Sequence, residues 1–184
     1  NISALSLKNA ELFKETQKLS ITDGLTGLYL NHFMLEEMQK LSQVPLDNKP
    51  LNTFSFMMMD LDNFKQVNDK YGHVVGDNVL IHTASIISKH CPPSGFAVRY
   101  GGEEFAMILP SLNKNEAYEI AEKIRLSVSD KKFFIRRETV ITTLSIGIAE
   151  YPSDTKDLRT LIQKADERMY EAKKRGKNNT VIHL

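Results

Sequence analysis

The chain has 184 residues, of which 41% are hydrophobic and 26% charged, and these proportions describe one globular domain with a sizeable core rather than a disordered chain. Its 24 basic and 23 acidic residues give a net charge of +1, which argues against a surface built to coat nucleic acid. A single cysteine excludes an internal disulfide framework and a multi-cysteine zinc site, and no apolar run approaches the ~20 residues of a membrane-spanning helix.

The first twenty residues predict a helix that precedes the globular domain. Its residues at alternating steps of three and four follow the a/d pattern of a coiled coil, namely Ile2, Leu5, Asn9, Leu12, Thr16 and Leu19. This helix either packs on its own domain or is the end of a dimerising helix from an upstream module. Turn residues at 23–27 end it, so we expect a helix over 1–20 and a domain over 21–184. Because the chain begins without methionine, we expect it to be a piece of a longer protein.

Apolar periodicity places the remaining elements along the chain. Further helices are predicted at residues 31–42, 64–70, 76–90, 113–129 and 158–172. Strands are predicted at residues 53–61, 96–98, 105–109, 140–148 and 180–183. This alternation of strands and helices predicts an α+β fold, an α/β sandwich with helices packed against one sheet.

Three of the predicted strands carry distinctive patterns. The strand over 53–61 is a continuous apolar run with three methionines, which is typical of a strand buried on both faces. Gly101-Gly102 separates the strands at 96–98 and 105–109, which predicts a hairpin. The strand over 140–148 alternates apolar residues with small ones on the other face, namely Thr143, Ser145 and Gly147.

Two acidic clusters interrupt apolar sequence at strand ends: Asp60 with Asp62, and Glu103 with Glu104. Because neighbouring side chains in an extended chain point to opposite faces, we expect only one glutamate to share a face with Asp60. Two carboxylates beside a backbone carbonyl form an all-oxygen site for Mg²⁺ or Mn²⁺. The helix after Asp62 would offer free N–H groups to a phosphate, and Lys65 would add a positive charge. Such a constellation suits nucleotidyl transfer. The structural alternatives are an N-cap with a solvated acid, and a solvated turn.

Several short motifs recur in order along residues 21–184. Residues 99–105 read Arg-Tyr-Gly-Gly-Glu-Glu-Phe and resemble the signature hairpin of GGDEF-family diguanylate cyclases, in its GGEEF form. The other segments that resemble this family are 23–28 (DxLTGL), 60–69 (DxDxFKxxND), 72–77 (GHxxGD), 144–149 (SxGIA) and 165–173 (ADxAxYxAK). A single such motif would be weak, whereas this ordered set is specific.

The resemblance implies a mostly antiparallel, palm-like sheet flanked by helices, as in nucleotide cyclases. Each subunit would bind one GTP with Mg²⁺ or Mn²⁺, two ions per GTP, and two subunits would meet as a homodimer. The 3′-hydroxyl of each GTP would attack the α-phosphate of the other, giving cyclic di-GMP and two pyrophosphates. We expect a bacterial cytoplasmic domain under an upstream sensory domain, with any membrane anchor elsewhere in the full-length protein. No nucleic-acid or membrane contact is expected from this segment.

The resemblance also assigns roles at the two acidic clusters. Asp60, Glu103 and the Leu61 carbonyl would bind the metal, and Glu103 is the candidate that deprotonates the 3′-hydroxyl. Lys65 would stabilise charge on the phosphates in the transition state. Glu104 belongs to the signature but receives no distinct role.

The resemblance also assigns residues that would bind the nucleotide's base and its outer phosphates. Asn68 and Asp77 would read the guanine edge, with His73 beside them, because a carboxylate accepts from guanine N1–H and N2–H whereas adenine presents an acceptor at N1. Lys173 and Lys177 would hold the outer phosphates. The structural alternatives are a helix terminus for Asn68, an N-cap for Asp77, a surface or packing role for His73, and a solvated helix end for the lysines.

Two departures from the family pattern stand out. Leu30-Asn31-His32 replaces an asparagine followed by two arginines, which affects a peripheral contact. Pro92-Pro93-Ser94-Gly95 stands where the family's product-inhibition site reads RxxD, so we predict no product inhibition through that site.

Three functions are compatible with these motifs. The leading hypothesis is an active, metal-dependent diguanylate cyclase. The alternative is a non-catalytic GTP-binding domain that regulates a neighbour, although the intact GGEEF and Asp-x-Asp motifs favour the enzyme. A cyclase with relaxed base choice is the third, and Asp77 argues against it.

Overall fold

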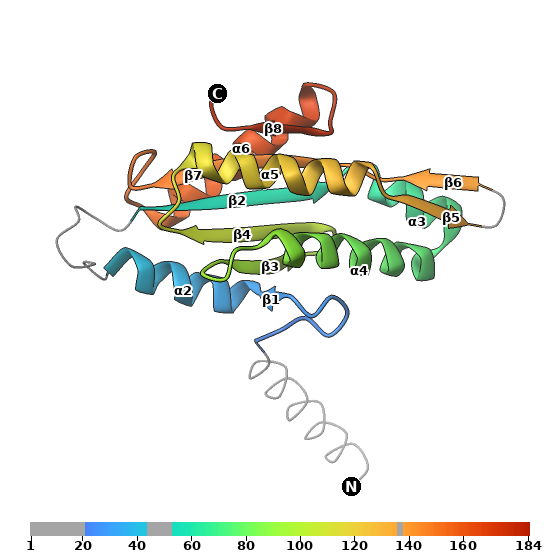
Figure 1. Ribbon diagram of the computed structural model, residues 1–184, viewed down its shortest axis with the longest axis horizontal. Coiled ribbons are helices and arrows are strands. Elements are labelled where there is room, and N and C mark those ends of the chain that lie inside the picture. The colour runs from blue at the N-terminus through green and yellow to red at the C-terminus, as the bar shows by residue number, and fades with distance from the viewer. Residues whose placement is uncertain (1–20, 44–52, 136–137) are drawn as a thin grey trace, which may run out of the picture.

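A computed structural model describes residues 21–43, 53–135 and 138–184, so the helix predicted over 1–20 lies outside the described residues. The main sheet has the strand order β1-β3-β4-β2-β7-β8 (Figure 1). Its strands are β1 (Tyr29–Leu30), β2 (Phe54–Leu61), β3 (Phe96–Gly101), β4 (Glu104–Pro110), β7 (Leu144–Tyr151) and β8 (Asn179–Val181). The β1–β3 and β7–β8 pairs are parallel and the three other pairs are antiparallel, which confirms the mostly antiparallel sheet.

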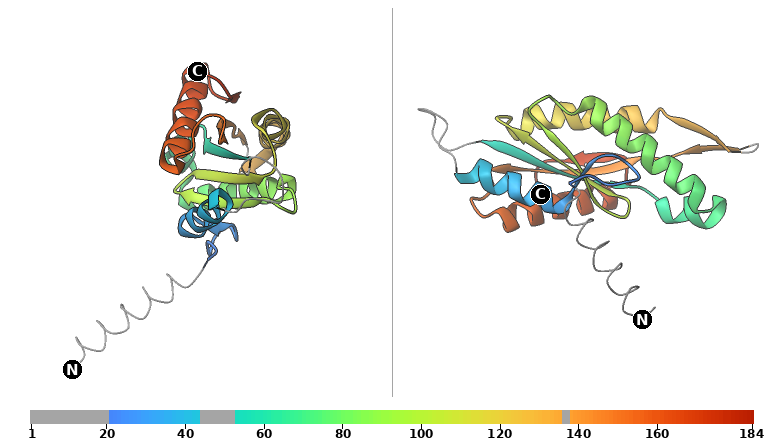
Figure 2. Two further views of the ribbon diagram at one scale, coloured as in Figure 1. Left: turned by 90° about the vertical axis from the view of Figure 1, so that its left-hand side faces the viewer. Right: turned by 90° about the horizontal axis from the view of Figure 1, so that it is seen from below.

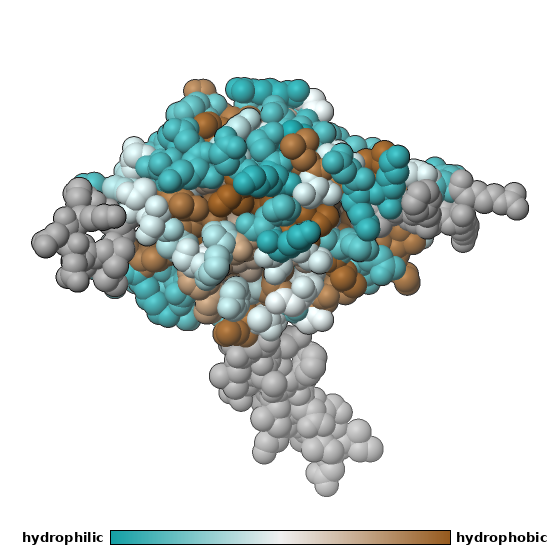
Figure 3. Space-filling model, viewed as in Figure 1, coloured by the Kyte–Doolittle hydropathy of each residue, from teal (hydrophilic) through white to brown (hydrophobic). Residues whose placement is uncertain are grey.

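Helices cover both faces of this sheet. They are α2 (Asn31–Gln43), α3 (Phe64–Tyr71), α4 (His73–His90), α5 (Lys114–Ser129) and α6 (Leu158–Lys174). Figure 2 shows α2 and α6 on one face and α4 and α5 on the other. On the side seen in Figure 3, exposed hydrophobic residues lie mainly in the band between α4 and α5, and most of the residues around them are hydrophilic. None of the described helices combines the length and the apolar character that a membrane crossing needs.

The central strand β2 divides the core into two clusters. Every residue of β2 is buried, as the apolar run predicted. Met57 and Met59 pack among residues of α4 and α5, whereas Phe56 and Met58 pack toward α2 and α6. This alternation across a sheet covered on both faces explains why β2 is apolar from Phe56 to Met59, with Ser55 as its one polar residue before Asp60.

The prediction of one continuous strand over 140–148 is wrong, because this segment contains parts of two strands. Residues 138–141 form β6 (Glu138–Ile141), which pairs with β5 (Lys132–Ile135) in a separate two-stranded sheet that the sequence did not predict. The Thr143 carbonyl accepts a hydrogen bond from the Asp62 N–H at 2.9 Å, so pairing with the β2 segment starts at residue 143. It continues in register as the β2–β7 ladder, with Leu144 opposite Leu61.

Helix α4 begins three residues before the predicted start at Gly76. Gly72, with φ of 84°, separates it from α3, and a non-glycine residue would be strained in that left-handed conformation. Asp77 therefore lies inside α4, and the N-cap alternative for this residue is wrong. In contrast, Asn113 caps α5 through a reciprocal capping box with Glu116, at the predicted boundary.

Two contacts fix α6 against β7. Buried Arg168 of α6 donates to the Ile148 carbonyl at 2.6 Å and to both oxygens of Asp154. Burial alone would raise the pKa of Asp154, but hydrogen bonds from Arg168, from the Glu150 N–H and from Lys114 outweigh it and hold the pKa well below its usual range. At Gly147 the helix backbone itself approaches the strand, so the small residues predicted on this face make room for α6.

Gly147→Ala should destabilise the domain strongly. An added Cβ would lie 2.0 Å from the Ala165 carbonyl oxygen and 2.3 Å from the Met169 nitrogen, and helix backbone cannot move aside locally. We expect a loss of about 2 kcal/mol or more in the free energy of unfolding, measured by urea denaturation. Gly24→Ala is the matched control, since nothing lies within 4 Å of its Cβ position. Equal stability of the two variants would contradict this packing.

Candidate functional site

The predicted metal-binding residues meet at the end of β2 that passes into α3 (Figure 1). Asp60 lies opposite Glu104 of β4 on one side and Ser145 of β7 on the other. Directly opposed residues of an antiparallel pair share a face, so Glu104 is the glutamate that shares a face with Asp60. Glu103 lies in the hairpin turn, where its carbonyl accepts from the Leu61 N–H at 3.3 Å.

Asp60 is a buried carboxylate in a negative environment. Its side chain is only 10% exposed, and burial is the main reason that its pKa is raised, with smaller contributions from Glu103 and Asp62. The ammonium of Lys173, 2.8 Å from Asp60 Oδ2, opposes this rise. Burial, Asp60 and Asp166 likewise raise the pKa of Glu104. The excess of negative charge over the one lysine is what a divalent cation would neutralise.

These residues fit a hard cation such as Mg²⁺ or Mn²⁺ in donor type. Asp60 and the glutamates supply oxygen donors at one strand end, and Leu61 continues the same strand. Among the residues that the structure describes, however, no three histidine, cysteine, aspartate or glutamate side chains form a complete metal cage. An ion here would therefore complete its coordination with backbone carbonyl, phosphate or water oxygens, as Mg²⁺ in phosphate sites usually does.

Asp62 has a different environment from Asp60, and the capping alternative for it is wrong. The N-cap of α3 is Asn63, which has φ of 59° and makes no side-chain capping bond. The buried Asp62 carboxylate instead accepts hydrogen bonds from Thr143, Ser145 and the Asn178 N–H. Sequence reasoning missed this role, because the donors lie 81 to 116 residues away along the chain.

The predicted phosphate-binding lysines reach the same strand end from two directions. Lys65 is exposed on the first turn of α3. Lys173 comes from the last turn of α6 and pairs with Asp60, while Lys177 follows α6 and donates to the Asn63 side chain. The fold therefore gathers these three cations around the loop that joins β2 to α3.

The predicted base-reading residues meet where α3 turns into α4. Asn68 packs so closely on Gly76 that a Cβ there would lie 1.9 Å from Asn68 Oδ1. This Oδ1 is buried and has no hydrogen-bond partner within the described part of the chain. Exposed Asp77 follows Gly76 directly, and His73 is the exposed first residue of α4. A buried amide oxygen without a partner in the described residues, close in the chain to an exposed carboxylate, suits a ligand with several polar edges.

Arg99 links the signature hairpin to the start of the domain, which sequence reasoning did not predict. Its guanidinium donates to both carboxylate oxygens of Asp23, at 3.0 and 3.1 Å, and to the Gly102 carbonyl at 2.9 Å. Asp23 also accepts from the Thr26 N–H and hydroxyl within its own turn. The hairpin turn is thus held by the segment that follows residue 20.

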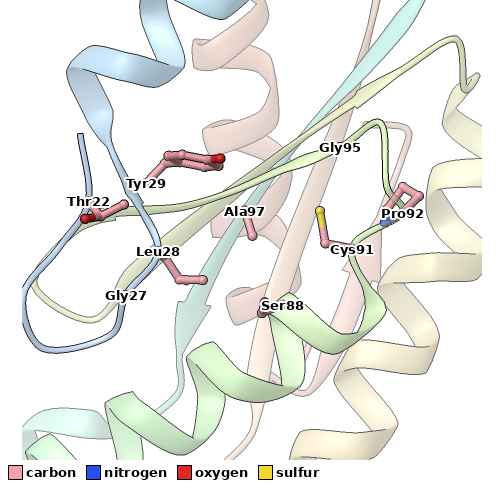
Figure 4. A pocket seen from close by; sticks show the side chains of 9 residues that line it. All are labelled: Thr22, Gly27, Leu28, Tyr29, Ser88, Cys91, Pro92, Gly95 and Ala97. Atoms are coloured by element: carbon pink, nitrogen blue, oxygen red, sulfur yellow. The ribbon is translucent and has the colours of Figure 1, made fainter.

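A pocket of about 360 Å³ lies away from these carboxylates and lysines, beneath the turn that leads into β1 (Figure 4). Cys91 and Pro92 line it, and burial raises the pKa of the Cys91 thiol to about 11, which leaves the thiol protonated at neutral pH. Gly95 and Ala97 complete its β3 side. The described lining carries no charged side chain, so nothing within it would pair with a phosphate.

Replacing Glu104 with glutamine should stabilise the metal-free protein. A carboxyl whose pKa is higher in the folded than in the unfolded state destabilises the fold when ionised. We therefore expect Glu104→Gln to raise the Tm at about pH 7 in EDTA, and the gain to disappear as the pH falls through the Glu104 pKa toward about 4.

Differential scanning fluorimetry provides the measurement. Glu119→Gln, at an exposed position of α5, is the control and should leave the Tm unchanged. A Tm at neutral pH that is unchanged or lower in Glu104→Gln would show that Glu104 is not in a repulsive cluster.

Comparison with known proteins agrees with this architecture. The family model described as "Diguanylate cyclase, GGDEF domain" matches residues 20–179. Diguanylate cyclase A of Treponema denticola is 33% identical over 183 residues, which cover 99% of this chain and 48% of the relative. The response regulator PleD of Caulobacter vibrioides is 35% identical over 167 residues, or 89% of this chain and 36% of the relative. The chain thus spans half or less of these curated relatives.

Solved structures show the same fold. The coiled coil and GGDEF domain of DgcB from Caulobacter crescentus, in complex with c-di-GMP, matches with a TM-score of 0.81 at 29% identity, covering 98% of this chain and 95% of that one. Diguanylate cyclase SiaD of Pseudomonas aeruginosa, in complex with its activator SiaC, matches with a TM-score of 0.81 at 27% identity, covering 99% and 70%. From its motifs, its sheet and these relatives, the chain belongs to the GGDEF family of diguanylate cyclase domains.

Proposed function

We propose that this domain condenses two GTP molecules into cyclic di-GMP and two pyrophosphates. The observation that carries the proposal is the meeting, at one strand end, of the Asp60 and Glu104 carboxylates with Lys173. A buried and a half-buried acid beside a lysine suit a metal-bound triphosphate, because Asp60 would hold the ion and Lys173 would hold a phosphate. Membership of a cyclase family makes GTP the nucleotide we assign.

The turn between α3 and α4 supports guanine as the base. Asn68 Oδ1 has no hydrogen-bond partner among the residues that the structure describes, and Asp77 directly follows Gly76, against which that amide packs. A carboxylate accepts from guanine N1–H and N2–H, whereas adenine offers an acceptor at N1 and would leave Asp77 unpaired. We assign His73 to the edge of this pocket.

The reaction joins O3′ of one nucleotide to the α-phosphorus of the other and breaks the bond from that phosphorus to the β-phosphate oxygen, so pyrophosphate leaves. Glu103 takes the hydroxyl proton, and Lys65 stabilises the charge that develops on the phosphate oxygens. Lys173 and Lys177 hold the outer phosphates. Mg²⁺ or Mn²⁺, bound by Asp60, Glu103 and the Leu61 carbonyl as two ions per GTP, would activate the hydroxyl and neutralise phosphate charge.

Each domain contains the residues for one nucleotide, so formation of two phosphodiester bonds requires two copies facing each other. We therefore assign the active state to a homodimer. The coiled-coil pattern over residues 1–20 supports a dimerising helix below a sensory domain in the full-length bacterial protein, with catalysis on the cytoplasmic side.

Incubation with GTP and either Mg²⁺ or Mn²⁺, followed by chromatographic separation of products, tests this function. Cyclic di-GMP should form at a rate per subunit that rises with protein concentration. Asp60→Ala and Glu103→Ala should each lower the rate by about a hundredfold or more, because each removes a group that acts in the transition state.

Glu119→Ala, on the exposed face of α5, should retain the wild-type rate. If GTP binds but no cyclic product forms at high protein concentration, the domain is instead a non-catalytic GTP-binding regulator. A mixed cyclic dinucleotide formed from GTP and ATP would contradict the assignment of Asp77.

Added cyclic di-GMP should leave the initial rate unchanged when GTP is saturating. Pro92-Pro93-Ser94-Gly95 offers neither a cation nor an acid, and the pocket that Pro92 and Gly95 line carries no charged side chain. The two phosphates of the product would have nothing to pair with in this loop. Strong inhibition that is removed by substitutions at 92–95, and kept when Glu119 is replaced, would contradict the prediction.

A further inference from the structure

Asp62 is a buried acid that the proposed reaction does not use. Only 4% of the residue is exposed, yet its carboxylate has three hydrogen-bond donors. Oδ1 accepts from the Ser145 hydroxyl at 2.7 Å. Oδ2 accepts from the Thr143 hydroxyl at 2.7 Å and from the Asn178 N–H at 3.0 Å. A buried carboxylate requires such partners, and these donors come from β7 and from the turn that leads into β8.

The turn that contains Asn178 has an unusual backbone. Lys177 and Asn178 are consecutive non-glycine residues with positive φ, of 65° and 45°. Such residues are disfavoured unless surrounding contacts hold them. The Lys177 N–H bonds to the Ala172 carbonyl at 3.1 Å, and the Asn178 N–H bonds to Asp62. Arg125 donates to the Asn178 carbonyl at 3.2 Å. Among the described residues, Asp62 is therefore the carboxylate that holds this turn through a backbone N–H, beside the Ala172 carbonyl and Arg125.

Three contacts join the end of β2 and the loop after it to the end of α6 and the turn that follows. Asp60 pairs with Lys173, and the Asn63 side chain accepts from Lys177. Asp62, which accepts from the Asn178 N–H, lies between Asp60 and Asn63 in the first segment, and Asn178 directly follows Lys177 in the second. The first two contacts use side chains that a bound nucleotide would recruit. The Asp62 contact uses backbone and a buried carboxylate, so it can persist when the lysines change partners.

We infer that Asp62 is a positioning residue. It fixes the turn at Lys177 and Asn178 against the end of β2, where the proposed metal ligands lie, and so sets the affinity for the outer phosphates of the nucleotide. This inference rests on the proposed function. Asp62 itself touches neither phosphate nor metal. It acts by keeping Lys177, and the end of α6 that carries Lys173, within reach of a triphosphate whose metal ion Asp60 would bind.

Two substitutions separate positioning from charge. In Asp62→Asn, an amide oxygen can still accept from Thr143 and Asn178, while the amide nitrogen donates to the Ser145 hydroxyl, which accepts as well as donates. Asp62→Ala removes every acceptor and leaves the Asn178 N–H without its partner. The asparagine variant should therefore keep the turn in place, and the alanine variant should release it.

Isothermal titration calorimetry in Mg²⁺ should compare GMP with guanosine 5′-[α,β-methylene]triphosphate, which cannot react because carbon replaces the α–β bridging oxygen. In Asp62→Ala, triphosphate affinity should fall by about tenfold or more while GMP affinity changes by less than about twofold. In Asp62→Asn, both affinities should stay within about threefold of the wild type.

Equal losses for GMP and the triphosphate in Asp62→Ala would overturn the inference, because a general structural defect affects both ligands. Unchanged triphosphate affinity would overturn it as well. Failure of the wild-type protein to prefer the triphosphate over GMP would instead count against the proposed function. If Asp62→Ala does not fold, amide hydrogen exchange in the unmodified protein decides. The Asn178 amide should be protected, and exchange at the rate of a free amide would contradict the inference.

Discussion

The ion pair between Asp60 and Lys173 is the interaction on which the site depends. Burial of Asp60, with Glu103 and Glu104 nearby, concentrates negative charge at the end of β2, and Lys173 is the cation that faces it at 2.8 Å. Such a cluster has a structural cost unless a cation compensates it. We interpret Lys173 as the partner that balances the acids in the free protein and is released to a phosphate when a divalent ion takes its place.

Contacts elsewhere in the fold bring Lys173 to Asp60 at the end of β2. Helix α6 can bring Lys173 to the strand end only because Gly147 lets its backbone lie against β7 and because Arg168 fixes the helix to Ile148 and Asp154. At the same strand end, the Thr143 carbonyl accepts from the Asp62 N–H, which holds the start of β7 against the loop after β2. The packing of the sheet and the geometry of the site are therefore consequences of the same contacts.

Local patterns predicted most of the elements, but not the long-range partners of Asp62 and Arg99. The apolar run of β2 and the start of α5 at Asn113 are encoded within a few residues, so the positions of both elements were correctly predicted. The two-residue strand β1 and the β5–β6 pair carry too few residues for a periodic signal. Asp62 and Arg99 were assigned no partner, because their partners lie 76 to 116 residues away and only the folded sheet brings them together.

A crystal structure of the domain with Mg²⁺ and guanosine 5′-[α,β-methylene]triphosphate would test whether Lys173 exchanges Asp60 for a phosphate when the ion binds. We expect Asp60 and Glu103 to contact the ion, Lys173 to leave Asp60 for an outer phosphate, and Asp62 to keep its bond to the Asn178 N–H. A complex in which Lys173 remains on Asp60 and the triphosphate binds elsewhere would contradict this expectation.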